Sequence, residues 1–192
     1  IKKEDQTIKY FNSFTIYDHN LEILNSYNKV NLVPFGEFLP LEKTLRLIGL
    51  KTITNNYQSY SRGKKRNIIE VNKINFSLKL LPLICYEIIY TGNIFKSTDF
   101  DFIVNISEDG WFGQSIGPHQ HFAHSIYRAI ESGKYVLRSA NNGITAIVNP
   151  LGVVEKQVDL NQSGFIDLSK TKKIEPTIFS KYGNKIFVVI IL

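Results

Sequence analysis

Short apolar or β-branched segments alternate with longer, helix-compatible stretches along this chain. Such alternation is typical of a layered α/β fold, in which helices cover a sheet. We expect strands at residues 13–17, 22–27, 76–84, 100–106, 135–140, 145–149 and 164–168. We expect helices at residues 41–48, 87–95 and 118–132.

The segment 118–132 carries the clearest helical pattern. Pro118 suits the first turn of a helix, because its missing N–H has no partner there. Phe122, Ile126 and Ile130 recur every four residues and form one apolar stripe. We therefore expect this helix to pack on the sheet.

The C-terminal segment has a different pattern. From Thr171 the sequence is a polar, proline-containing connector, and an apolar run follows at residues 185–192. This run fits either a core strand or the first turns of a transmembrane helix, and periodicity does not separate the two. No stretch reaches the roughly 18 apolar residues of a membrane-spanning helix. The N-terminal residues do not resemble a signal peptide.

The composition narrows the class of protein. The chain has 192 residues, of which 43% are hydrophobic and 21% charged. These proportions exclude collagen-like, coiled-coil and disordered chains, and the length favours one domain. A single cysteine excludes an internal disulfide. Because the chain contains no methionine, we expect it to be a piece of a longer protein.

The formal net charge of +6 favours anionic surfaces, such as nucleic acid or acidic lipid. The densest basic cluster, residues 62–66, is flanked by tyrosine and asparagine, so it is predicted to be a solvated loop. No zinc-ligand spacing or RNA-binding aromatic signature accompanies it. We therefore expect no nucleic-acid partner.

Cys85 follows the apolar run 80–84 and precedes Tyr86 and Glu87, where a helical pattern begins. It is thus predicted to lie at a strand-to-helix turn. Backbone N–H groups at a helix start favour a thiolate and can donate to an oxyanion. The alternative is that Cys85 is a small residue of the hydrophobic core, because free cysteines are among the most buried residues. Spacing alone leaves both roles open.

Two charged residues further upstream are candidates for supporting roles. Lys29 follows a predicted strand, and a cation there can stabilise an oxyanion, although a solvated surface lysine is the alternative. Glu37 stands beside Gly36 and between Phe35 and Phe38. This setting predicts a partly desolvated carboxylate with a dedicated partner.

Residues 105–113 close an apolar strand with a polar loop that carries the single tryptophan, Trp111. Loops at strand ends are where α/β folds place substrate contacts. Residues 117–124 contain three histidines, of which only His121 and His124 share a helical face. No carboxylate joins them at ligand spacing, so we expect no metal site.

Arg128 and Glu131 are three residues apart on the predicted helix 118–132. Residues at that spacing lie on the same helix face and can pair. We predict that they form a structural pair that anchors the helix and does not contact substrate.

Several motifs along the chain resemble the nitrilase superfamily and, within it, the bacterial apolipoprotein N-acyltransferase family. The combination of Pro-Phe-Gly-Glu and Gly-Pro-His-Gln-His is the most specific part of the resemblance. The motifs lie at residues 27–29, 32–37, 83–87, 105–107, 111–113, 117–121, 128–131 and 141–143.

The resemblance implies a four-layer αββα sandwich with a Glu-Lys-Cys catalytic set, here incomplete at the N-terminus. Residues 1–170 would form this catalytic domain, and residues 171–192 a connector and the start of a truncated transmembrane helix. The resemblance also implies a place in the bacterial inner membrane, with the catalytic domain facing the periplasm. Members of the family need no cofactor. They transfer an acyl chain from a phospholipid to the N-terminal amine of a diacylglyceryl-cysteine apolipoprotein.

Matched by motif, Cys85 corresponds to the nucleophile and Lys29 to the catalytic lysine. The residues matched to supporting active-site positions are Glu37, Tyr86, Glu87 and Trp111. The catalytic glutamate has no match, because in the family it lies upstream of the segment where this chain begins. We therefore expect the isolated chain to be inactive and poorly soluble. A soluble nitrilase-type amidase and a non-catalytic remnant of a split gene are the alternatives.

Overall fold

The computed structural model describes residues 2–4, 7–41, 44, 47, 49, 59–73, 76–92, 97–172 and 174–191. The chain divides into two compact units, Ile1–Asn67 and Ile68–Leu192. Each unit is described by itself.

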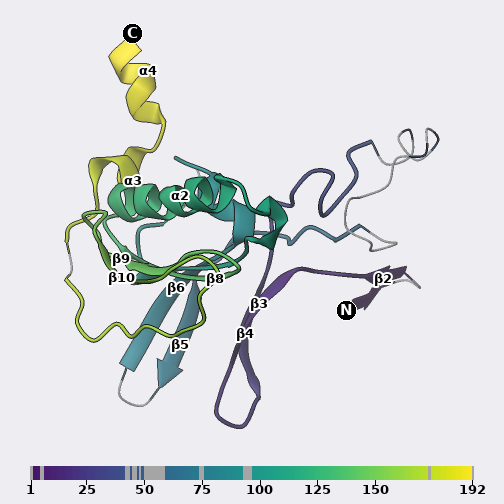
Figure 1. The fold of residues 1–192 in the computed structure, drawn as a ribbon, viewed down its shortest axis with the longest axis horizontal. Helices are drawn as coiled ribbons and strands as arrows, with labels where there is room; N and C mark the ends of the chain where they lie inside the picture. The colour runs from purple at the N-terminus through teal and green to yellow at the C-terminus, as the bar shows by residue number, and fades with distance from the viewer. Residues whose placement is uncertain are drawn as a thin grey trace. The chain divides into compact units, whose positions relative to one another are not determined.

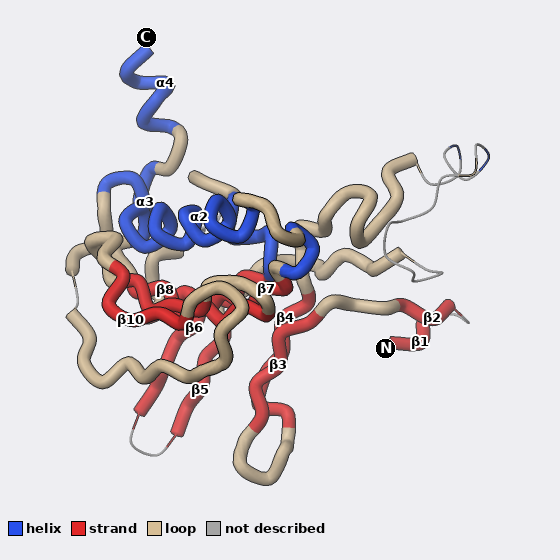
Figure 2. Tube along the Cα trace, viewed as in Figure 1, coloured by secondary structure: helices blue, strands red, loops and turns tan. Residues whose placement is uncertain are grey.

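The first unit contains two antiparallel hairpins (Figure 2). The first pairs β1 (Lys2–Glu4) with β2 (Thr7–Lys9), and the second pairs β3 (Ser13–Tyr17) with β4 (Ile23–Asn28). The predicted strand 13–17 is confirmed, and the next begins one residue later than predicted. The predicted helix 41–48 lies largely outside the described residues.

The second unit is built on a mixed sheet, which the described residues form in the order β10-β9-β8-β7-β6-β5 (Figure 1). The central strands β6, β7 and β8 are parallel, and the outer pairings are antiparallel. The strands are β5 (Ile69–Lys73), β6 (Phe76–Ile84), β7 (Phe102–Glu108), β8 (Tyr135–Asn141), β9 (Thr145–Val148) and β10 (Val154–Val158).

One face of this sheet is covered by α2 (Gly117–Ser132), as Figures 1 and 2 show. The helix ends at Gly133, whose φ of +67° is left-handed and suits glycine. The predicted packing on the sheet is confirmed, but the apolar stripe is not, because Ile130 is 46% exposed. The core between helix and sheet includes Leu81, Leu83, Ile103, Phe122, Ala129, Val136, Ala146 and Val148.

The strand register places three residues in one row across the parallel strands. Leu83 of β6 aligns with Asn105 of β7, which aligns with Arg138 of β8. Aligned residues of paired strands project to the same face of the sheet. The polar side chains of Asn105 and Arg138 therefore lie next to each other beside the apolar core.

Several of the described segments differ from the sequence-based expectation. Residues 164–168 form no strand, and β5 and β10 are strands that the pattern did not reveal. Phe165 is 86% exposed, whereas Ile166 and Leu168 are half-buried, so the alternation of this segment sets its burial but does not make it a strand. The described part of the predicted helix 87–95 is helical only to Ile89, as the end of a short 3₁₀ helix, η1 (Cys85–Ile89), and residues 93–95 lie outside the described residues. A second 3₁₀ helix, η2 (Gly110–Phe112), follows β7.

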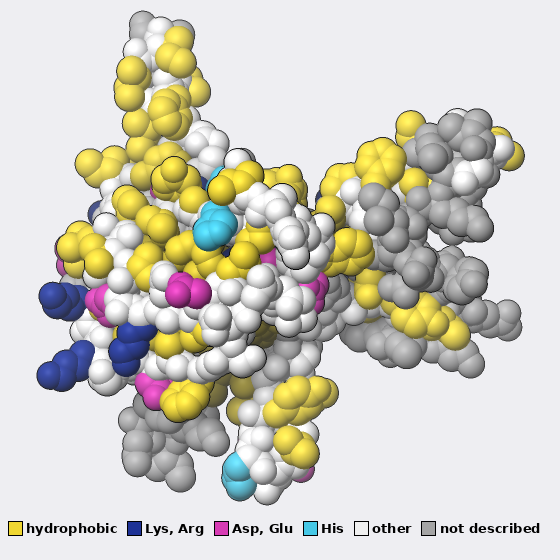
Figure 3. All heavy atoms as spheres, in the orientation of Figure 1, with side chains coloured by type: hydrophobic (Ala, Val, Ile, Leu, Met, Phe, Trp, Pro, Cys, Tyr) yellow, Lys and Arg dark blue, Asp and Glu magenta, His cyan; other side chains and the backbone are white. Residues whose placement is uncertain are grey.

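The C-terminal segment forms α3 (Ile178–Tyr182) and α4 (Lys185–Ile191). The apolar run at residues 185–192 is therefore helical over its described part and is not a core strand. Its apolar side chains are exposed, and Figure 3 shows them gathered on α4. Within the described part of the chain, every helix is too short or too polar to cross a bilayer.

Candidate active site

Cys85 lies where β6 ends and η1 begins, so its predicted strand-to-helix placement is confirmed. Its φ is +51°, a conformation that residues with a side chain seldom adopt. Such strain costs on the order of 1–3 kcal/mol and clusters at functional sites. The thiol is half-buried and donates to the Glu108 carbonyl oxygen, with the sulfur and oxygen 3.9 Å apart.

The side chains that follow Cys85 stabilise the turn. Glu87 is fully buried and accepts a hydrogen bond from the backbone N–H of Ile84, at 3.0 Å. This contact fixes Ile84, the residue before Cys85, to the first turn of η1. Tyr86 is half-buried and packs edge to face on Tyr90, with the ring centroids 6.0 Å apart.

Asn105 connects the turn to the centre of the sheet. Its side-chain Nδ2 donates to the carbonyl oxygens of Leu83, at 2.9 Å, and Cys85, at 3.4 Å. Both carbonyl groups flank Ile84, so one buried amide holds the end of β6 and the first residue of η1 together. This contact is a direct result of the register that sets Asn105 beside Leu83.

The Asn105 amide belongs to a buried ionic cluster that also contains Asp109, His121 and Arg138. Arg138 donates through Nη1 to Asn105 Oδ1 and through Nη2 to Asp109 Oδ2, the latter at 2.6 Å. Asp109 also binds Nδ1 of His121, at 2.9 Å, and accepts the hydroxyl of Ser107, at 2.7 Å. These contacts connect β7, β8 and α2 through one carboxylate.

The charge state of Asp109 follows from its partners. Burial alone would raise its pKa, but the hydrogen bond from His121, the charge of Arg138 and the Ser107 hydroxyl together hold this pKa below its ordinary value. Gly143 makes room for the carboxylate, since a Cβ at that position would lie 2.3 Å from Asp109 Oδ2. Asp109 is therefore ionised and fully buried, and it binds Ser107, His121 and Arg138 at once.

The proton on His121 can be assigned from these contacts. A neutral Nδ1 without a hydrogen cannot lie 2.9 Å from a carboxylate oxygen, so Nδ1 donates to Asp109. His121 belongs to α2 and is buried, and its Nδ1 binds this carboxylate. Within the described ranges, no group of three or more His, Cys, Asp and Glu side chains has the geometry to hold a metal ion.

The first unit holds a second buried charge pair. Lys29 is 1% exposed, and its Nζ lies 2.8 Å from Glu37 Oε2, so the surface-lysine alternative is wrong. Glu37 also accepts from Asn12 Nδ2 and from the Val33 N–H, each at 2.8 Å. The predicted desolvated carboxylate with a dedicated partner is confirmed. A Cβ at Gly63 would lie 2.1 Å from the Asn28 carbonyl oxygen, so this backbone approach needs glycine.

Arg128 and Glu131 form the predicted pair, with Nη2 and Oε1 2.6 Å apart. Arg128 also donates to the carbonyl oxygens of Ile89, at 3.3 Å, and Tyr90. Thr91 donates to Glu131 Oε1 at 2.8 Å. Burial lowers the pKa of Arg128 against the effect of Glu131, and burial raises that of Glu131 against Thr91 and Arg128. The pair therefore ties α2 to the segment that follows η1.

The other predicted site residue, Trp111, lies on η2 and is 60% exposed. The structure leaves its ring accessible at the end of β7.

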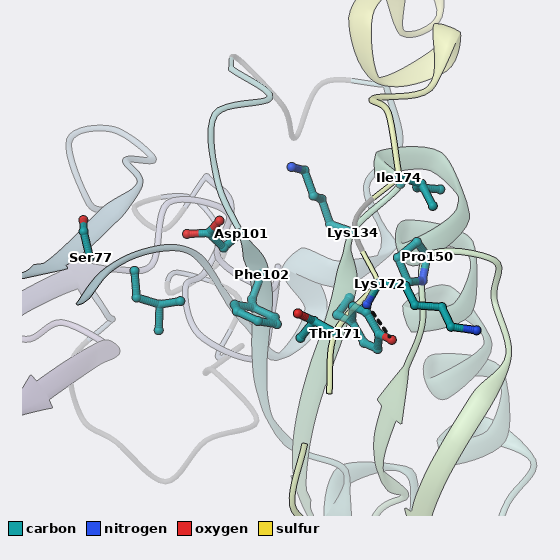
Figure 4. A pocket seen from close by; sticks show the side chains of 11 residues that line it. Ser77, Asp101, Phe102, Lys134, Pro150, Thr171, Lys172 and Ile174 are labelled. Carbon is teal, nitrogen blue, oxygen red and sulfur yellow. Dashed lines mark hydrogen bonds between the residues drawn. The ribbon is translucent and has the colours of Figure 1, made fainter. Parts of the chain in front are cut away.

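The second unit contains a cavity of about 220 Å³ (Figure 4). It is lined by Ser77, Phe102, Tyr135 and other residues at the N-terminal ends of β6, β7 and β8. Cys85 follows the opposite, C-terminal end of β6, about 25 Å along the strand at ~3.3 Å per residue. This cavity therefore lies at the opposite end of the strands from Cys85.

The sequence matches the carbon-nitrogen hydrolase family over residues 1–172. The chain belongs to this family. It is 39% identical over 185 residues to an apolipoprotein N-acyltransferase of Rickettsia typhi, and 37% identical over 175 residues to one of Bradyrhizobium diazoefficiens. These matches cover 95% and 91% of the chain but only 36% and 32% of the relatives. The chain thus spans about a third of the length of these curated relatives.

Solved structures of the carbon-nitrogen hydrolase fold agree at the level of architecture. An amidase from Nesterenkonia with an acrylamide adduct on its active-site cysteine matches with a TM-score of 0.50 and 15% identity. The match covers 77% of this chain and 52% of the amidase. It supports a nitrilase-like α/β fold.

Three residues of the ionic cluster were not selected individually from the sequence, although the first two lie in the segment 105–113 that was: Asn105, Asp109 and Arg138. Asn105 and Arg138 each follow three apolar or aromatic residues of a strand but are followed by further polar residues, so the sequence does not mark them as buried. Asp109 gave no signal either, because an acid in a polar loop is common. Its importance arises from His121, which α2 brings to it from twelve residues further along the chain.

Proposed function

We propose that this chain carries the nucleophile-bearing part of an apolipoprotein N-acyltransferase. The observation that carries the proposal is its 39% identity, over 95% of its length, to a relative of that name. Cys85 in a strained turn at the start of η1 supports a nucleophilic role. The finer fold, a four-layer αββα sandwich, belongs to the same proposal.

The proposed reaction has two steps. The Cys85 sulfur attacks an ester carbonyl of a phospholipid, an S–C bond forms, and the C–O bond to glycerol breaks. The thiol proton leaves with the alcohol of the lysophospholipid. The N-terminal amine of a diacylglyceryl-cysteine apolipoprotein then attacks the thioester, an N–C bond forms and the C–S bond breaks. One amine proton returns to the thiol.

The remaining roles follow the family resemblance. Backbone N–H groups near Tyr86 and the Lys29 cation are proposed to stabilise the oxyanion. Glu37 would hold Lys29, and Glu87 would hold the nucleophile turn. Trp111 is proposed to contact substrate, and Arg128 with Glu131 to anchor α2.

We also propose a location at the bacterial inner membrane, with the catalytic domain facing the periplasm. The positive net charge and the exposed apolar side chains of α4 support contact with lipid. Residues 1–170 would then be the catalytic domain and residues 171–192 the connection to the membrane. Phospholipid, apolipoprotein and membrane are the proposed partners.

The test uses the natural gene product that carries this sequence, in detergent micelles with an isotope-labelled phospholipid. We expect the tryptic peptide of residues 80–96 to gain one labelled acyl group, and a synthetic diacylglyceryl-cysteine peptide to become N-acylated. The matched variant Cys85→Ser should lose the thioester adduct and the transfer. Transfer that persists in Cys85→Ser would contradict the role of this residue. Hydrolysis of short amides without acyl uptake would instead favour the amidase alternative.

A further inference from the structure

Burying the ionic cluster beside α2 costs the protein folding free energy. Asn105, Asp109, His121 and Arg138 are each at most 3% exposed. Burying charges costs several kcal/mol per ion, and apolar replacements of buried ion pairs are often neutral or stabilising. Packing therefore does not explain why two charged and two polar side chains occupy this part of the core.

The contacts of Arg138 fix its guanidinium from three directions. Nε donates to the Ile144 carbonyl oxygen at 3.2 Å, Nη2 to Asp109, and Nη1 to Asn105 Oδ1. The last contact determines the orientation of the Asn105 amide. With Oδ1 directed at Arg138, Nδ2 is directed at the carbonyl groups of Leu83 and Cys85.

We propose that Arg138 is a positioning residue for Cys85: it orients the Asn105 amide, and this amide holds the strained turn that presents the thiol. The inference rests on the proposed function, because it assumes that Cys85 is the nucleophile. Asp109, with His121 and Ser107 attached, serves as the anchor that keeps Arg138 in place.

A second observation connects the same two residues. Desolvation lowers the pKa of Arg138, while the charge and hydrogen bond of Asp109 and, as the smallest effect, the electrostatics of Cys85 oppose this shift. The guanidinium is thus coupled to the thiol through space as well as through Asn105. A misplacement of about 1 Å at a reacting atom can cost ~100-fold in rate, so a rigid support has a functional purpose.

Two variants of the natural gene product separate orientation from charge. Arg138→Lys keeps the positive charge beside Asp109 but lacks the planar set of donors that binds three groups at once. Asn105→Asp keeps the shape and the contact with Arg138 but replaces the donor Nδ2 by an oxygen. The control is Thr145→Val, which removes a 3.1 Å hydrogen bond from the Ala140 N–H in the same sheet, outside the cluster.

We expect kcat for acyl transfer to fall about 10- to 100-fold in both variants, with KM unchanged, and to stay within about twofold in Thr145→Val. Backbone hydrogen exchange at residues 84–89 should accelerate in the two variants but not in the control. Because one variant keeps the charge and the other adds a negative one, a loss shared by both reflects the orientation of the amide.

Two results would overturn the proposal. Faster exchange with an unchanged kcat would make the cluster merely structural, and unchanged exchange at residues 84–89 would mean that Asn105 does not hold the turn. If Arg138→Lys does not fold, Asn105→Asp decides alone, since it replaces a single NH₂ group by oxygen. If the unmodified protein transfers no acyl group, the proposed function fails separately, and hydrogen exchange still decides whether Arg138 and Asn105 hold the turn.

Discussion

At the scale of single residues, charged side chains are enclosed as ion pairs in the described part of the protein. Lys29 with Glu37 and Arg138 with Asp109 are ion pairs at 2.8 and 2.6 Å, almost without solvent contact. Removing one partner of such a pair leaves a buried charge uncompensated. Each pair should therefore respond much more strongly to substitution than an exposed pair does.

Asp109→Asn tests this expectation. We expect a loss of about 3–5 kcal/mol in the free energy of unfolding at pH 7, because Arg138 stays buried without its counter-charge. Asp99→Asn is the matched control, since it breaks an exposed contact with Lys79 of the same length, 2.6 Å, and should change stability far less. Urea denaturation measures both, and equal effects would contradict the prediction.

The same residue predicts a pH dependence. The pKa of Asp109 is lowered from its ordinary value of 3.8, so the folded state binds fewer protons than the unfolded state in the range between the two values. Its contribution to stability is present above about pH 4 and is lost as the pH falls through the folded-state pKa. The difference in stability between the unmodified protein and Asp109→Asn should therefore narrow in acid. A difference that stays constant from pH 7 down to the acid transition would contradict this assignment.

At the scale of elements, α2 is the part that holds the second unit together. Its buried face carries Phe122 and Ala129 into the apolar core, His121 into the ionic cluster, and Arg128 to the end of η1. The helix thus contacts the end of η1 directly through Arg128 and the ionic cluster through His121. A substitution on this face should alter the structure of η1, whereas a substitution on the exposed face of the helix should not.

A double-mutant cycle on Arg128→Met and Glu131→Gln tests the anchoring role. We expect Arg128→Met to cost about 3–5 kcal/mol, because the carbonyl groups of Ile89 and Tyr90 and the Glu131 carboxylate lose their donor. The double variant should be more stable than the sum of the single changes predicts, by about 0.5–3 kcal/mol. Tyr127→Ala, on the exposed side of α2, serves as the control. A coupling energy of zero between the two substitutions would contradict the prediction that Arg128 and Glu131 act as a pair.

At the scale of the whole molecule, a net charge of +6 and an exposed apolar helix occur in one chain. Charge attracts the protein to anionic lipid and is screened by salt, whereas apolar burial is not. The five apolar side chains Phe187–Ile191 of α4 are between 56% and 82% exposed. We therefore expect vesicle binding with a salt-sensitive and a salt-resistant part.

Flotation with phosphatidylglycerol vesicles measures both parts. Val189→Ser with Ile190→Ser should weaken the salt-resistant binding about 100-fold, since each change removes about 1–2 kcal/mol of apolar burial. Leu151→Ser is the control, because this side chain is 70% exposed but lies on the turn after β9. Equal losses in the two cases, or binding that salt abolishes entirely, would contradict a role for α4 in contact with lipid.

The sequence by itself determined the features that depend on near neighbours. Strands 13–17 and 76–84 have the predicted bounds, α2 begins one residue before its predicted start, and Cys85 lies at the predicted turn. Apolar periodicity, a proline in the first turn and the change of period after residue 84 are local signals. Family membership was likewise accessible from short motifs, because these keep their order along the chain.

Only the tertiary structure decided the features that depend on distant partners. Segment 164–168 alternates like a strand but pairs with none, while 154–158 pairs with β9 and becomes one. Lys29 is buried because Glu37 compensates its charge. The support of the Cys85 turn arises from register, since pairing of β6, β7 and β8 sets Leu83, Asn105 and Arg138 in one row. A hydrogen bond between side chains 33 residues apart leaves no periodic trace in the sequence, so the polar centre of this core emerged only with the fold.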